Sequence, residues 1–289
     1  MIVTAYKINA FAKTKNGGNP AGVVIDEVNL TDNEMKKVAM ILGLSETAFV
    51  TKSDVADYKV RFFTPTDEVD LCGHASIGTF STLLSKGLII PGQYTQETKA
   101  GILNIEVFKD TTIMMNQNLP EFSDFINPIE IAESLNISMD DLDENLPIQI
   151  VSTGLRDIIV PVKNLKILNG IRPDFKKVSE ISEKYKVVGY HIFTKDSLYQ
   201  SNAHCRNIAP LYGINEESAT GTASGALACY LHKQGRLQND KLLRLIFEQG
   251  YLMSLPSEIL VTLIIEDDKV VEVKVGGKAS NLVEIQVEI

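Results

Sequence analysis

One short sequence occurs twice in this chain, and each copy begins a long stretch without charged residues. Residues 72–76 read Cys-Gly-His-Ala-Ser, and residues 220–224 read Thr-Gly-Thr-Ala-Ser. No Asp, Glu, Lys or Arg follows until Lys86 in the first stretch and Lys233 in the second. A helix without a charged face is typical of a buried position. The repeat therefore predicts two buried helices, one in each of two similar halves.

The first turn of such a helix offers backbone N–H groups that have no partner within the helix, together with the positive end of the helix dipole. Two helix N-termini that face each other could hold a small carboxylate from both sides. We therefore expect a binding cleft between the two halves.

Most of the remaining chain has the two-residue alternation and the β-branched residues that are typical of strands. The predicted strands are residues 1–12, 21–26, 47–51, 57–63, 102–109, 111–116, 148–152, 157–162, 187–194, 243–249, 259–266, 270–276 and 282–289. Amphipathic helices are predicted at residues 32–42, 129–135 and 174–185, and Thr31 and Glu34 have the spacing of a capping box at the first of them.

The many strands for each buried helix indicate a curved sheet wrapped around a helix, built twice, which is an α+β fold. Pro120 interrupts the strand pattern within residues 119–125. We expect an N-terminal half at residues 1–118 and a C-terminal half at residues 119–289, with the last strands able to cross back to the first half.

Charge and composition exclude several classes of partner. The 289 residues carry a net charge of −9 without a basic run, which disfavours nucleic acid. No apolar run approaches the roughly 20 residues of a membrane-spanning helix, and residues 1–4 lead into a strand pattern without the features of a secretory signal. Three cysteines, an odd number, indicate reduced thiols and a cytoplasmic protein.

Cofactor and metal signatures are also missing from the sequence. It contains no glycine-rich phosphate-binding motif, so we expect no nucleotide cofactor. Its four histidines, at positions 74, 191, 204 and 232, do not have the spacing of a zinc site, so we expect no metal.

Six short motifs follow one another along almost the whole chain. They are residues 19–24 (NPAGVV), 45–50 (SETAFV), 61–65 (RFFTP), 71–76 (LCGHAS), 206–210 (RNIAP) and 216–225 (EESATGTASG). In this order they resemble the PhzF family, the phenazine-biosynthesis-like relatives of diaminopimelate epimerase. The resemblance implies two β-barrel-like halves, each around a central helix, with an active site in the cleft between them. It also implies an isomerase without a cofactor, a small carboxylate as substrate, and a homodimer.

Glu46 is the first candidate for the chemistry. It precedes a predicted strand and is surrounded in sequence by Leu44, Ala48 and Phe49. An apolar surrounding suits a carboxyl group that both takes and returns a proton. On its own, a glutamate before a strand is read as a solvated surface residue. The resemblance implies instead that Glu46 is the proton shuttle.

His74 would lie in the first turn of the first buried helix, where the helix dipole disfavours an imidazolium. The alternative is a histidine that caps the helix or sits satisfied in the core. The resemblance implies that His74 lines the substrate pocket. Gly73, Gly221 and Thr222 would donate hydrogen bonds to an anionic group, although close helix–strand packing would also explain the glycines. Further family positions expected near the site are Asn19 and Ser45.

Glu217 is where the chain departs from the family pattern. The family usually reads Glu-Asp-Pro-Ala-Thr-Gly-Ser-Ala, whereas residues 216–223 read Glu-Glu-Ser-Ala-Thr-Gly-Thr-Ala. Glu217 therefore replaces the aspartate of the site and is one methylene longer. We expect it to remain a catalytic carboxylate, and the alternative is a solvated loop residue. The change leaves open whether the substrate is that of the phenazine pathway.

Three functions remain open at this point. The first is a cofactor-independent isomerase in which Glu46 moves a proton between carbons. The second is an amino-acid epimerase or racemase in which Cys72 acts with Glu46 or Glu217, since a helix N-terminus favours a thiolate. The related diaminopimelate epimerases and proline racemases use two facing thiols, one at the head of each central helix. The position that corresponds to the second thiol is Thr220 in this chain, which disfavours a two-thiol racemase. The third is a catalytically idle protein that binds a small molecule.

Overall fold

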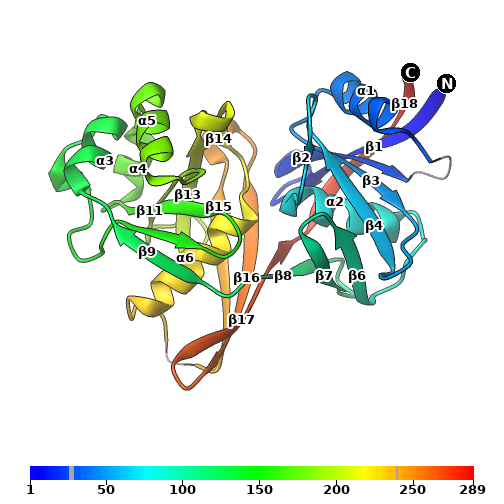
Figure 1. Ribbon diagram of the computed structural model, residues 1–289. Coiled ribbons are helices and arrows are strands. Elements are labelled where there is room, and N and C mark those ends of the chain that lie inside the picture. The colour runs from blue at the N-terminus through cyan, green and yellow to red at the C-terminus, as the bar shows by residue number, and fades with distance from the viewer. Residues whose placement is uncertain (26–28, 239) are drawn as a thin grey trace. The chain divides into compact units, whose positions relative to one another are not determined.

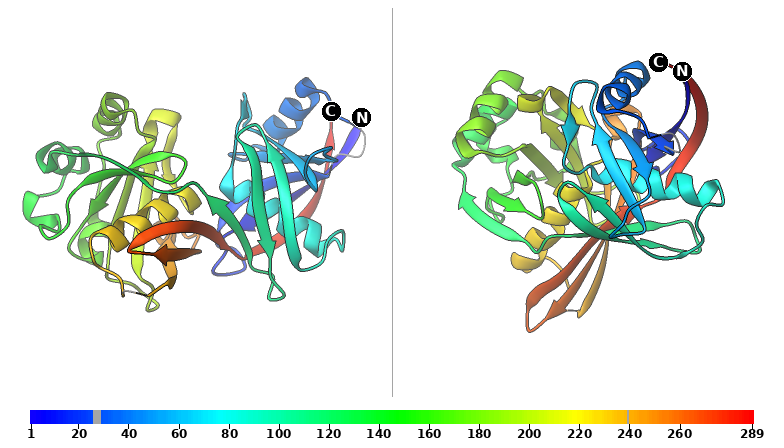
Figure 2. Two further views of the ribbon diagram at one scale, coloured as in Figure 1. Left: turned by 60° about the horizontal axis from the view of Figure 1, so that its bottom comes forward. Right: turned by 45° about the vertical axis from the view of Figure 1, so that its right-hand side comes forward.

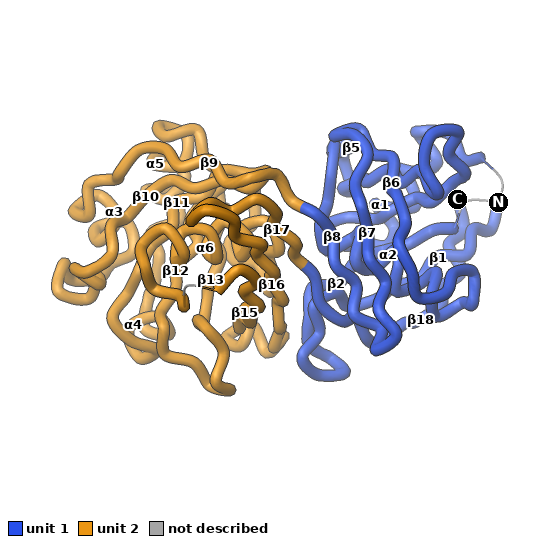
Figure 3. Tube along the Cα trace, turned by 90° about the horizontal axis from the view of Figure 1, so that it is seen from below, with its two compact units in different colours: residues 1–116, 276–289 blue, residues 117–275 orange. Residues whose placement is uncertain are grey.

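The chain folds into two compact units, shown in different colours in Figure 3. The computed structural model describes residues 1–25, 29–238 and 240–289. Unit 1 comprises residues 1–116 and 276–289, and unit 2 comprises residues 117–275. The last strand of the chain thus belongs to the same unit as the first.

Unit 1 is a curved sheet with its strands paired in the order β18, β1, β2, β3, β4, β6, β7 and β8, and with β5 beside β4. The strands are β1 (Ile2–Ala10), β2 (Asn19–Ile25), β3 (Thr47–Thr51), β4 (Tyr58–Phe63), β5 (Glu68–Val69), β6 (Gly92–Thr98), β7 (Gly101–Val107), β8 (Ile113–Gln117) and β18 (Ala279–Glu288). Strands β1 and β18 are antiparallel, so the two termini lie side by side in Figure 2, where the Met1 ammonium donates to the Ile289 carbonyl oxygen at 2.6 Å.

The central helix of unit 1 is α2 (Gly73–Ser85), which packs against β1, β2, β3 and β18. Figure 1 shows it among the strands of this unit. A Cβ atom on Gly78 would lie 3.0 Å from Ile8 Cγ2, so the missing side chain lets the helix approach β1 closely. The second helix, α1 (Asp32–Leu42), begins with the predicted capping box of Thr31 and Glu34.

Unit 2 has a second sheet, paired in the order β9, β10, β11, β12, β13, β15 and β16, with β14 beside β13. The strands are β9 (Glu121–Phe125), β10 (Gln149–Ser152), β11 (Arg156–Pro161), β12 (Gly189–Thr194), β13 (Ala203–Ala209), β14 (Ile214–Glu217), β15 (Leu242–Gln249), β16 (Ser257–Glu266) and β17 (Lys269–Gly277). Strand β17 follows β16 after a turn at Asp267 and Asp268, which both have positive φ.

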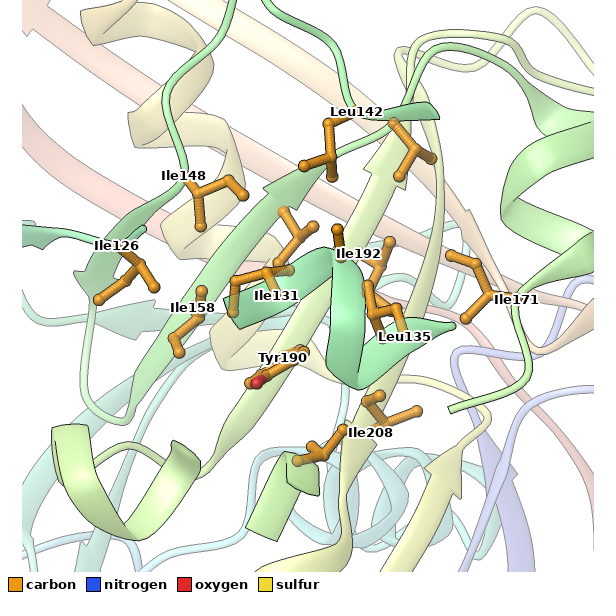
Figure 4. Close-up of a cluster of buried hydrophobic side chains, with 14 of the residues drawn as sticks. Ile126, Ile131, Leu135, Leu142, Ile148, Ile158, Ile171, Tyr190, Ile192 and Ile208 are labelled. Atoms are coloured by element: carbon orange, nitrogen blue, oxygen red, sulfur yellow. The ribbon is translucent and has the colours of Figure 1, made fainter. Parts of the chain in front are cut away.

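The helices of unit 2 lie on both faces of its sheet. They are α3 (Pro128–Leu135), α4 (Leu165–Gly170), α5 (Phe175–Tyr185) and α6 (Gly221–Lys233), with short 3-10 helices at Met139–Asp141, Pro210–Tyr212 and Tyr251–Met253. Helix α6 is the central helix and packs against β10, β11 and β16. Figure 4 shows the opposite face, where Ile131 and Leu135 of α3 lie against Ile158, Tyr190 and Ile192 of the strands.

The two buried helices and the three amphipathic helices predicted from sequence are confirmed, as are most predicted strands. Asp26, at the end of one predicted strand, lies outside the described residues. Within residues 119–125, where the strand pattern is interrupted in the sequence, β9 forms and pairs with β10. The change from unit 1 to unit 2 falls between residues 116 and 117, beside the expected division of the halves. Pro120 precedes the first residue of β9, a position at which proline costs the sheet no hydrogen bond.

Besides the short 3-10 helices, five further elements were not predicted: β5, β6, β13, β14 and α4. Strand β6 is polar and partly exposed, and β13 places polar residues at fully buried positions, so neither has the expected apolar pattern. None of the helices in the described part of the chain is long and apolar enough to cross a membrane.

Candidate active site

Glu46 lies directly before β3, and its backbone carbonyl accepts a hydrogen bond from Gly22 N–H of β2 at 3.0 Å. The backbone of this carboxyl-bearing residue is therefore fixed by two strands. Its side chain is 17% exposed, and its Oε2 lies 3.3 Å from His74 Nε2. Oε2 is buried and makes no hydrogen bond within the described residues. Glu46 is therefore partly shielded from water and has a carboxylate oxygen available for chemistry.

His74 occupies the first turn of α2, as predicted, and its side chain is 5% exposed. Ser45 Oγ lies 3.4 Å from the same ring nitrogen, Nε2, that Glu46 approaches. The structure thus brings together three predicted site residues at one end of α2. The two ring nitrogens of an imidazole at this position can take part in hydrogen bonds with a bound ligand.

Cys72 is the N-cap residue of α2, and its side chain makes no capping hydrogen bond within the described chain. Its Sγ lies 3.3 Å from His74 Nδ1 and 3.9 Å from Nε2. These two distances are similar, whereas an atom that lies along the lone pair of one ring nitrogen is much farther from the other nitrogen. The sulfur is therefore not aligned with the lone pair of either ring nitrogen.

The donor atoms of Glu46, Cys72 and His74 lie within 4.8 Å of one another. These are residue types that bind zinc. A metal ion shared by the sulfur and one ring nitrogen, however, would place the sulfur well away from the other ring nitrogen, whereas Sγ is at similar distances from both. As placed, the three side chains fit a cluster of polar contacts better than a tetrahedral metal site.

The remaining predicted residues of unit 1 are Asn19 and Gly73. Asn19 is buried at the start of β2, a strand that packs on α2. A Cβ atom on Gly73 would meet Met115 Cε at 3.6 Å, an ordinary contact. Packing therefore does not require glycine at the head of α2, which favours the reading that the backbone there is kept open for a ligand.

The predicted residues of unit 2 lie at the head of α6. Glu217 ends β14, is half-buried, and accepts a hydrogen bond from Thr220 Oγ1 at 2.6 Å. Gln249 Nε2 donates to the backbone carbonyl oxygen of Glu217 at 2.8 Å. Gly221 and Thr222 begin the helix, and Thr153 Oγ1 donates to the Thr222 carbonyl at 3.0 Å. Glu217 is thus a strand residue held by hydrogen bonds and not a solvated loop residue.

Sequence reasoning missed a buried polar cluster in unit 2. Its members are Asp157, His191 and Asn207, which are all 2% exposed or less. The available signal was their spacing, because each occupies an inward position of a strand where an apolar residue is expected.

Two arginines of the family motifs form ion pairs within their own units. Arg61 binds Glu68 through two hydrogen bonds and also reaches Asp32. The pKa of Glu68 falls to about 2, chiefly because of its hydrogen bond to Arg61. Arg206 binds Glu216 in the same two-fold manner. Both arginines are therefore held in ion pairs with acidic residues of their own unit. The sequence alone did not show whether they form ion pairs or bind a substrate carboxylate.

Comparison with known proteins covers nearly the whole chain. The family model of the phenazine biosynthesis-like proteins, PhzC-PhzF, matches residues 8–284. An uncharacterised isomerase of Clostridium acetobutylicum is 38% identical over 95% of this chain and 94% of its own. The trans-2,3-dihydro-3-hydroxyanthranilate isomerase of Pseudomonas chlororaphis is 27% identical over 93% of this chain and 94% of its own.

A solved structure confirms the fold. The crystal structure of a PhzF-family phenazine biosynthesis protein from Bacillus anthracis superposes with a TM-score of 0.93, at 34% identity and with 100% of both chains covered. The predicted α+β architecture, with a central helix in each half, is therefore confirmed.

Proposed function

This chain belongs to the phenazine biosynthesis-like (PhzF) family of isomerases, and we propose that it moves a proton between carbons of a small carboxylate with Glu46 as acid and base. The observation that carries the proposal is the buried Oε2 of Glu46, which lies against His74 without a hydrogen bond in the described chain. A carboxylate oxygen in this setting is suited to accept a proton from carbon.

The proposed reaction has two steps. Glu46 Oε2 takes a proton from a carbon next to an unsaturated or carbonyl system, and the electron pair of the broken C–H bond enters that system. Glu46 then returns the proton to a different carbon, so atoms and charge balance. His74, beside Ser45, is placed to stabilise the charge that develops between the steps.

Each unit, taken by itself, offers donors for substrate binding at the head of its own central helix. Gly73 at the head of α2, and Gly221 and Thr222 at the head of α6, offer backbone or hydroxyl donors to a carboxylate. We further assign Asn19 to substrate binding and Glu217 to proton transfer or to a cationic group of the substrate. We also propose a cytoplasmic homodimer without nucleic-acid or membrane partners and without a cofactor.

The test is solvent deuterium incorporation followed by NMR in D₂O. The first compound is trans-2,3-dihydro-3-hydroxyanthranilate, which the name of the Pseudomonas chlororaphis relative gives as its substrate. Other small carboxylates that raise the melting temperature follow. We expect a compound that gains deuterium at carbon and changes the position of its double bond. Tight binding without exchange would contradict the proposal and favour an idle binding protein.

An epimerase that uses Cys72 is the second candidate, and the contact between its Sγ and the His74 ring favours it. Under the proposal above, Cys72→Ser keeps deuterium exchange within about tenfold of wild type, because Glu46 carries the proton. Under the epimerase reading, exchange at the α-carbon of an amino acid falls ~100-fold or more. Cys229→Ser, at a buried position of α6, is the matched control for loss of a thiol.

A further inference from the structure

Three polar side chains face the central helix of unit 2 from the adjoining strands β11, β12 and β13. Asp157, His191 and Asn207 alternate along these strands with residues of the apolar cluster in Figure 4, such as Ile158, Tyr190 and Ile208. The three therefore point to the other face of the sheet, toward α6. Phe193, two residues after His191 on β12, contacts Tyr230 of α6, with ring centroids 6.0 Å apart. This contact shows that α6 covers the face of the sheet to which His191 points. The cluster thus lies inside unit 2, beneath its central helix.

The cluster is hydrogen-bonded but not saturated. The Asp157 carboxylate accepts hydrogen bonds from the Asn207 side chain and from the Gly189 backbone N–H. Asn207 Nδ2 lies 3.3 Å from His191 Nδ1. Asp157 Oδ1 and His191 Nε2 are buried without a hydrogen-bond partner among the described residues. Natural proteins rarely leave such atoms unpaired, and each one calls for an explanation.

Glu217 is the charged neighbour of this cluster. The register of β13 and β14 places Asn207 opposite Glu217. Asn207 therefore lies between two carboxyl groups, since its side chain also binds Asp157. Burial, followed by the negative charge of Glu217, raises the pKa of Asp157 to about 8.

The other neighbours of Asp157 bring little compensating charge. His191 on β12 is neutral, because burial lowers its pKa to about 3. Val151 on β10 faces Asp157 in the register. Arg156 is adjacent on β11, where side chains alternate between the two faces of the sheet. The first turn of α6, residues 221–224, carries no charged side chain and contributes only its dipole.

We propose that Asp157 and Glu217 form a carboxyl pair with a single negative charge near neutral pH, the proton residing on Asp157, and that Asp157 is thereby a positioning residue for substrate binding at the head of α6. Two neighbouring carboxyl groups in a water-poor site do not both ionise. Glu217 keeps the charge, because it is nearer to solvent and accepts the Thr220 hydroxyl at 2.6 Å. A second negative charge at this helix N-terminus would repel the substrate carboxylate, and the proton on Asp157 prevents this.

The carboxyl pair of Asp157 and Glu217 is tested on the free enzyme. The measurement is ¹³C NMR of the aspartate side-chain carboxyl carbons during a pH titration. Asp157→Asn identifies the signal, and Asp124→Asn, at an exposed position of β9, is the matched control. We expect the Asp157 signal to titrate near pH 8. In Glu217→Gln the midpoint should fall by roughly one pH unit, because the neighbouring charge is removed.

Two outcomes would overturn the pairing. One is an Asp157 signal that titrates in the ordinary range of aspartate, and the other is a midpoint that does not respond to Glu217→Gln. If Asp157→Asn does not fold, the signal that moves in Glu217→Gln still decides the question. This titration needs no substrate, so its result is separate from that of the proposed isomerisation.

The positioning role rests on the proposed function and is read from the pH dependence of deuterium exchange. We expect the KM of the wild type to rise several-fold as pH passes 8, while kcat changes little, because the second charge weakens binding of the substrate carboxylate. In Asp157→Asn this rise should disappear. A KM that rises equally in both proteins would refute the positioning role, even if the carboxyl pair exists.

Discussion

Replacing Glu46 with glutamine should lower kcat for deuterium exchange by ~10³-fold, within the range that general acid–base groups contribute. Glutamine has nearly the same shape, so the contacts of β3 and of the His74 ring are kept, but its amide cannot accept a proton from carbon. KM should change little, because we assign carboxylate binding to the heads of the central helices. The measurement is steady-state exchange in D₂O, with a thermal melt to confirm that the variant is folded.

Two further variants sharpen this prediction. Glu46→Asp keeps a carboxylate but withdraws it by about 1.5 Å, one C–C bond, so it should recover part of the lost activity. Glu284→Gln, at an exposed position of β18 in the same unit, should be indistinguishable from wild type. If Glu46→Gln kept more than about a tenth of the wild-type rate, Glu46 would not be the acid and base, since such a group contributes at least 100-fold.

The parts of the fold that could be predicted are those with a local signal. Helix α2 has no Asp, Glu, Lys or Arg, α6 has none before its last residue, Lys233, and α1 has a capping box, so nearby residues alone specify them. Strand β13 could not be predicted, because three of its buried side chains, those of His204, Arg206 and Asn207, are polar and their partners are distant in sequence. His204, for example, is buried against Glu248 at 2.8 Å, a residue 44 positions away. Only the folded chain shows that such polar residues are satisfied.

The same distinction holds for the candidate site. Glu46 and His74 could be named because short motifs surround them, and the structure places them 3.3 Å apart. Physical reasoning on Glu46 alone predicts a solvated surface residue, so the motif carried that assignment. Asp157 was missed, although its spacing places it at an inward position, because an aspartate at the start of a strand resembles a turn residue. Its burial and its relation to Glu217 depend on the pairing of four strands.

Arg206 shows how a motif residue can serve the site from a distance. Its side chain is 7% exposed and binds Glu216 through two hydrogen bonds, of 2.9 and 2.8 Å. Its Nη1 also donates to the carbonyl oxygens of Leu168 and Ile171 at the C-terminal end of α4. Helix ends leave such carbonyls without partners, and a cation there is favourable. Arg206 thus joins α4 to β14, the strand that ends at Glu217.

Arg206→Met should therefore lower the free energy of unfolding by about 3–5 kcal/mol, the cost of leaving one partner of a buried ion pair uncompensated. The Glu216 carboxylate, whose side chain is 20% exposed, would keep its charge without its partner, and two carbonyl oxygens would lose their donor. Urea unfolding of wild type and variant at neutral pH measures the difference. Arg244→Met, at an exposed position of β15, is the matched control and should change stability by no more than about 0.5 kcal/mol.

A double variant separates the ion pair from the helix contacts. In Arg206→Met with Glu216→Gln no unpaired charge remains, so part of the lost stability should return, and the part still missing reports the two carbonyl bonds to α4. A loss below about 1 kcal/mol in Arg206→Met would mean that the pair contributes no more than an exposed one. The four hydrogen bonds of Arg206 would then not account for the presence of an arginine at this position of the motif. Direct contact with the substrate would be the remaining explanation.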